Sequence, residues 1–208
     1  MDIQFYGANA LVLSTKGIRL VVDDNLSDMG SKSVTKPGDI VLFTGAHGSP
    51  AVETRLVVNG PGEYEASGLS ITGIAARGHM DASGTKQMTM YKILHDNTSY
   101  LIVGHVYPEL SEAQLELLNM VDVLIVPVGG NGYTLDPIGA LKLIKNIEPK
   151  IVIPTHYDDS ALAYPVPQQP LEQVLKNIGM EPKLTTTKYH YKPQDISDSA
   201  QLVILERS

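Results

Sequence analysis

The first half of the chain alternates short apolar runs with turn residues, a pattern typical of β-strands joined by tight connections. The connections are marked by small and turn-forming residues, as in Gly7-Ala8-Asn9 and Pro37-Gly38. Strands are predicted at residues 2–6, 11–14, 18–23, 39–43, 55–58, 69–75, 88–94 and 100–103. This half of the chain therefore predicts sheet rather than helix.

Helical patterns begin only in the second half. Ser111, with Gln114 three residues later, forms a capping box that predicts a first helix. The pair Asp136-Pro137 is an N-cap followed by proline at the first helical position, which predicts a second helix over residues 136–147. Apolar residues at i, i+3, i+4 and i+7 predict a third helix over residues 170–178.

Continuous apolar strands lie between these helices, at residues 123–128 and 151–154. Strands that are apolar on both faces belong to sheets covered by helices, usually parallel ones. The end of the chain returns to strand pattern at residues 184–191 and 202–205. We therefore predict one α/β domain over residues 1–208, with two sheets, each flanked by helices, in layers.

Composition narrows the functional classes. The 208 residues are 43% hydrophobic, with net charge -7 and a pI near 5.3. This acidic balance argues against a nucleic-acid partner and against a basic membrane anchor. The absence of cysteine excludes disulfides, thiolate zinc sites and cysteine nucleophiles. The N-terminus has no signal-peptide pattern and no apolar run could span a bilayer, so we expect a cytoplasmic protein.

Polar side chains collect just after the predicted strands, where α/β proteins place their sites. Four of the six histidines do so: His47, His79, His105 and His156. A single loop histidine is usually an ordinary solvated residue, but four such positions give about even odds that some share one cleft. Glu63 and Asp81 also follow strands, although Glu63 is read more simply as a turn residue.

The order of these segments resembles the metallo-β-lactamase superfamily, and within it the small metal-dependent hydrolases similar to L-ascorbate-6-phosphate lactonase. The resemblance covers nearly the whole chain and is carried by the stretches GPGEYE, DVLIVPVGGNGYTLD and EPKIVIPTHY. It implies a four-layer αβ/βα sandwich with the polar strand ends gathered along one edge.

The metal-binding motif of that family is degenerate here. The family pattern Thr-His-x-His-x-Asp-His corresponds to residues 44–50, where only His47 is retained as a ligand. The other three ligand positions of this stretch hold Gly45, Ser49 and Pro50. His105 replaces the bridging aspartate, His156 matches the last histidine, and His79 matches another only with a shift of one residue.

These replacements remove both anionic ligands of a two-metal site, so a dinuclear centre is not expected. The resemblance then implies at most one zinc or manganese ion, held by His47, His105 and His156 with His79 as a fourth candidate. Asp81 and Glu63 are the candidate acid/base groups. The expected activity is hydrolysis of a small metabolite such as a lactone or a phosphorylated sugar acid. The alternative is a metal-free pseudoenzyme that serves as a binding or scaffold protein.

Overall fold

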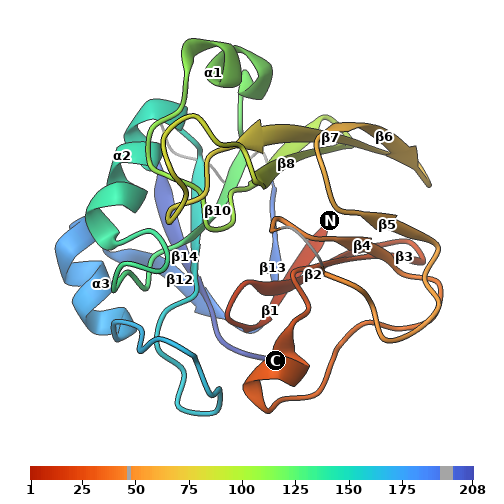
Figure 1. Ribbon diagram of the computed structural model, residues 1–208, viewed down its shortest axis with the longest axis horizontal. Coiled ribbons are helices and arrows are strands. Elements are labelled where there is room, and N and C mark those ends of the chain that lie inside the picture. The colour runs from red at the N-terminus through yellow and green to blue at the C-terminus, as the bar shows by residue number, and fades with distance from the viewer. Residues whose placement is uncertain (46–47, 193–198) are drawn as a thin grey trace.

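The computed structural model describes residues 1–45, 48–192 and 199–208, and within them the chain forms two facing β-sheets (Figure 1). The first sheet begins with an antiparallel meander and ends with parallel strands. Its order is β13 (Tyr189–His190), β1 (Asp2–Gly7), β2 (Ala10–Thr15), β3 (Ile18–Val22), β4 (Ile40–Leu42) and β5 (Leu56–Val58).

The second sheet is larger and combines five parallel strands with an antiparallel edge. Its order is β12 (Pro182–Thr186), β14 (Gln201–Leu205), β11 (Ile151–Thr155), β10 (Val123–Pro127), β9 (Thr98–Ile102), β8 (Met88–His95), β7 (Leu69–Ala76) and β6 (Gly62–Ala66). Two facing sheets confirm the predicted α/β fold class.

Helices α1 (Glu112–Leu118), α2 (Pro137–Ile147) and α3 (Leu171–Ile178) lie together along one side of the molecule, beside the larger sheet (Figure 1). The capping box of α1 is present, and the Asp136 side chain accepts a hydrogen bond from the Gly139 amide at the start of α2. The apolar faces of these helices pack on Leu124, Val126 and Val152 of the sheet. No helix among the described residues is long and apolar enough to cross a membrane.

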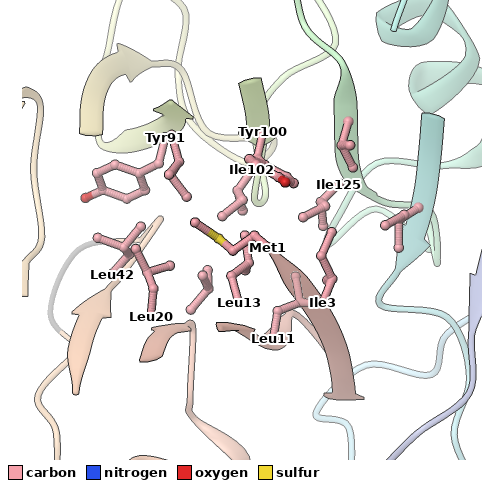
Figure 2. Close-up of a cluster of buried hydrophobic side chains, with 14 of the residues drawn as sticks. Met1, Ile3, Leu11, Leu13, Leu20, Leu42, Tyr91, Tyr100, Ile102 and Ile125 are labelled. Carbon is pink, nitrogen blue, oxygen red and sulfur yellow. The ribbon is translucent and has the colours of Figure 1, made fainter. Parts of the chain in front are cut away.

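The main core fills the space between the two sheets (Figure 2). Ile3 and Leu13 from the smaller sheet meet Tyr100 and Ile125 from the larger one, and all four side chains are at most 1% exposed. Neighbouring residues of β10 alternate between this core and the helix side, which explains why its sequence is apolar throughout. The prediction that such strands are buried on both faces is confirmed.

The outer face of the smaller sheet differs from the expectation of flanking helices. There Val12, Val21 and Val41 pack under Val34 of the loop between β3 and β4. Within the described residues this loop contains only a single turn of 3-10 helix, η1 (Leu26–Met29). A row of three valines is a narrow apolar surface, and a loop side chain is enough to cover it.

Two smaller expectations also change. The single strand predicted over residues 184–191 is two strands, β12 and β13, which belong to different sheets. The segment around Glu63, expected as a loop, forms β6 and pairs with β7. Its alternation of glutamate with tyrosine and alanine is a pattern of period two, which is typical of a strand at a sheet edge.

Candidate functional site

A cavity of about 430 Å³ opens where the strands of both sheets end. Its position follows from topology, because the carboxyl ends of parallel strands lie side by side and their loops share one edge. The lining side chains come from loops after β1, β3, β4, β7, β9, β10 and β11. Those with polar groups are Asn9, Asp23, Asn25, Asp28, Thr44, His79, Asp81, His105, Tyr133 and His156.

Three of the four histidines predicted from sequence line this cavity. The rings of His105 and His156 meet edge to face, with centroids 4.6 Å apart. The backbone N–H of His79 donates to the carbonyl oxygen of His105 at 2.7 Å, which joins these two loops. His47 lies outside the described residues. His79, His105 and His156 therefore share one cleft.

His156 is held in one orientation by Gln168. The Gln168 Nε2 group donates to the Val166 carbonyl at 2.7 Å, which turns Gln168 Oε1 toward His156 Nδ1 at 3.2 Å. Because Oε1 can only accept, His156 Nδ1 carries the ring proton and Nε2 keeps its lone pair. Burial lowers the pKa of His156, so the ring is neutral near pH 7. Its backbone φ of 55° is uncommon outside glycine and is found preferentially at functional positions.

His105 has the opposite arrangement. The Thr155 hydroxyl donates to Asn9 Oδ1 at 2.9 Å, so the amide nitrogen of Asn9 faces His105 Nε2 at 3.1 Å and donates to it. The proton of the neutral ring is then on Nδ1, which is buried without a partner among the described residues. Burial, with the neighbouring His156 and His79, lowers the pKa of His105 to about 3.

Asp23 is a cavity residue that the sequence pattern does not single out, because an Asp-Asp pair is equally compatible with a solvated turn. Asp24 accepts from the amides of Val34 and Thr35, which lie 10 and 11 residues further along the chain, and so braces the loop between β3 and β4. Asp23 instead accepts from the Thr44 amide at 2.7 Å and the Thr44 hydroxyl at 2.6 Å. Burial raises the pKa of Asp23 to about 6 in spite of these bonds.

The two predicted acid/base carboxylates have different surroundings. Asp81 lines the cavity, and its Oδ2 accepts from the Gly78 amide at 2.9 Å. Glu63 is exposed on β6 and accepts from the Thr72 hydroxyl at 3.2 Å on the adjacent strand. Glu63 is absent from the residues that line the cavity. The structure thus brings Asp81 to the histidines but not Glu63.

The described donor set does not by itself fit a metal ion. No group of three His, Asp or Glu side chains within residues 1–45, 48–192 and 199–208 has the arrangement of a metal site. His156 Nε2 has a lone pair available to a metal ion, whereas His105 Nε2 already accepts a hydrogen bond from Asn9. An ion at His105 would need Nδ1 as ligand, with the Asn9 amide turned so that Oδ1 accepts from Nε2–H.

Residues 2–156 match the family model described as the beta-lactamase superfamily domain. This match covers well over half of the chain. The chain belongs to the beta-lactamase superfamily.

Solved structures of low identity share the superfamily fold. A candidate Zn-dependent hydrolase of the metallo-β-lactamase superfamily from Thermotoga maritima is 21% identical, with a TM-score of 0.74, and covers 99% of this chain and 98% of its own. A metallo hydrolase from Ignicoccus hospitalis is 17% identical, with a TM-score of 0.63 and coverages of 99% and 95%. At these identities the likeness describes the fold alone.

A curated relative aligns over a short segment. It is a metal-dependent hydrolase of Carboxydothermus hydrogenoformans, 46% identical over 41 residues. That segment is 20% of this chain and 18% of the relative, so the alignment spans less than a fifth of the relative's length. The alignment is too short to carry the relative's activity to this chain, and the branch similar to L-ascorbate-6-phosphate lactonase stays a prediction.

Within this superfamily fold, two supporting residues had no signal in the sequence. Gln168 lies in the loop before α3, and only the folded chain brings it to His156. Asn9 was noticed as a turn residue, and its contact with His105 spans 96 positions of sequence. The close approach of Gln168 requires a glycine at position 129, where a Cβ atom would stand 2.2 Å from Gln168 Oε1.

Proposed function

We propose that the cavity is the reaction site of a hydrolase that acts on a small metabolite, such as a lactone or a phosphorylated sugar acid. The observation that supports this is the meeting of His79, His105 and His156, from three separate loops, in one cavity of about 430 Å³. That volume is in the range of small-molecule sites. Superfamily membership supports hydrolysis as the reaction class.

The proposal includes at most one metal ion, zinc or manganese, held by His47, His105 and His156 with His79 as a fourth candidate. Three protein ligands and a water are sufficient for a catalytic zinc site. Gly45, Ser49 and Pro50 hold three positions where the superfamily motif has ligands, which argues against a second ion. Asp81 is the carboxylate that the proposal keeps as acid/base group, and Glu63 has no part in it because it lies outside the cavity lining.

A second candidate function is a metal-free binding protein with the same cavity. The observation that favours it is that Asn9 and Gln168 already bond one nitrogen each of His105 and His156. These bonds orient the rings without an ion. A binding protein would use the same cavity and the same small-molecule class, so metal content separates the two candidates.

The test is metal analysis of untagged protein by mass spectrometry, before and after incubation with micromolar zinc or manganese. We expect no more than one ion per chain. His156→Ala should reduce that content sharply, while His190→Ala, which removes an exposed histidine paired with Asp2, should not. Two ions per chain would refute the mononuclear proposal. Protein that stays metal-free, with lactone hydrolysis absent, favours the binding protein.

A further inference from the structure

The charged side chains that line the cavity are all acidic among the described residues. Asp23, Asp28 and Asp81 all line it, and no lysine or arginine does so among the described residues. The undescribed positions 46–47 and 193–198 contain neither residue type in the sequence. Of the lining carboxylates, Asp28 is exposed in η1 at the mouth, and Asp81 is half-buried.

Arg77 lies close to the cavity in sequence, but its guanidinium group makes its contacts outside the lining. Arg77 donates through Nε to the backbone carbonyl of Asp81 at 2.9 Å, and its guanidinium lies over the Tyr107 ring, 4.0 Å from the centroid. It is therefore engaged in the wall behind the cavity rather than facing into it.

The groups that do face the cavity suit an uncharged polar molecule. His105 lines the cavity, and its buried Nδ1–H has no partner among the described residues. His156 Nε2 offers a lone pair to a hydroxyl group or a water. Met80, Met88 and Phe43 supply apolar surface around these groups.

We infer that the cavity selects against anions, so that its substrate or ligand is an uncharged lactone or ester rather than a phosphorylated sugar acid. A phosphate group placed here would lose its hydration, meet carboxylates at short range and find no cationic side chain to pair with. This inference rests on the proposed function, because it assumes that the cavity is the ligand site.

The test uses a neutral sugar lactam, a non-hydrolysable analogue of a sugar lactone, and its phosphate monoester. Binding of each is measured by calorimetry at pH 7.5 in 50 mM and 500 mM NaCl. We expect the neutral compound to bind at least tenfold more tightly at low salt. The difference should shrink at high salt, where charge repulsion at the open mouth is screened.

Two charge-reversal variants and one cavity-filling variant test whether the preference for the neutral compound arises in the cavity. Asp28→Lys should reduce the preference for the neutral compound at least threefold, whereas Glu116→Lys, the same charge change on the exposed face of α1, should leave it unchanged. Gly45→Leu should abolish binding, because Gly45 lines the cavity and the nearest described atom to its Cβ, chain neighbours aside, would be Met88 Cε at 3.6 Å, which leaves room for the leucine side chain to fill the cavity.

Two results are decisive in different ways. Binding of the phosphate monoester as tight as that of the neutral compound, and lost in Gly45→Leu, would overturn the inference while leaving the proposed function intact. If neither compound binds, or if Gly45→Leu binds as well as the unaltered protein, the cavity is not the ligand site. In that case the proposed function fails, and the inference fails with it.

Discussion

Asp23→Asn tests the electrostatics of the cavity through protein stability. Asparagine has nearly the shape of aspartate, and its Oδ1 can accept from the Thr44 amide while its Nδ2 donates to the Thr44 hydroxyl. Both native hydrogen bonds therefore have an equivalent in the variant, and the fold should be retained. What the substitution removes is the proton equilibrium of a buried carboxyl group.

The sign and the size of the expected change in stability follow from the linkage between proton binding and folding. Burial raises the pKa of Asp23 from 3.8 to about 6, so between these values the folded chain binds more protons than the unfolded chain. The resulting stabilisation is complete below pH 3.8 and is lost as pH rises through 6. A shift of this size corresponds to about 3 kcal/mol in total, of which about 2 kcal/mol is lost between pH 4.5 and 7.5.

The pH dependence of the stability of the unaltered protein would not by itself show the contribution of Asp23. The pKa values of His105 and His156 are lowered, so those residues destabilise the fold as pH falls, in the direction opposite to Asp23. The difference between protein and variant removes their contribution. We therefore expect the free energy of unfolding of Asp23→Asn, relative to the unaltered protein, to rise by about 2 kcal/mol from pH 4.5 to 7.5.

Urea unfolding followed by circular dichroism measures both proteins at each pH, with equal m-values as the check that the folded and unfolded states are comparable. Glu116→Gln is the control, because it removes an exposed carboxylate on α1. A difference between protein and variant that stays constant with pH, or that changes in the opposite direction, would refute the reasoning about Asp23.

Two further substitutions test the supports of the fold and site. Gly129→Ala should destabilise the protein by about 2 kcal/mol or more and disturb the His156 ring signals in NMR spectra, because its Cβ would stand 1.9 Å from the His156 carbonyl oxygen. Gly132→Ala, at φ 78° with nothing within 4 Å, should cost only about 1 kcal/mol, and equal losses would contradict the packing argument. Ser111→Ala should cost about 1 kcal/mol in thermal or urea unfolding by removing the α1 cap, whereas Ser111→Asp should retain most of it.

Local signals predicted the elements well where their causes are local. The capping box at Ser111 and the Asp136-Pro137 pair specify helix starts through contacts within four residues, and both helices begin there. The apolar strands β10 and β11 were predicted because burial on both faces leaves no polar position. The missing helices over the smaller sheet depend on how wide an apolar surface three valines make, which is a property of the folded sheet.

The site was predictable only in part for the same physical reason. The position of His105 and His156 after strands placed them at one edge, since parallel strands end side by side. Their protonation states depend on Asn9 and Gln168, which no spacing rule connects to them. The role of Asp23 depends on burial, and the sequence Asp-Asp is equally compatible with a solvated turn.

Three features of the cavity destabilise the fold, and this destabilisation bears on whether the cavity has a function. It holds a buried carboxyl group at Asp23, a buried ring nitrogen at His105 that has no partner in the described part of the chain, and a left-handed backbone at His156. Each of these features costs stability, on the order of 1–3 kcal/mol, and apolar side chains at the same positions would avoid it. A chain specified only for stability would not gather three such features around one opening. They argue for a ligand that contacts these groups, whether or not the protein also hydrolyses it, and the charge of that ligand is the property that this lining constrains most directly.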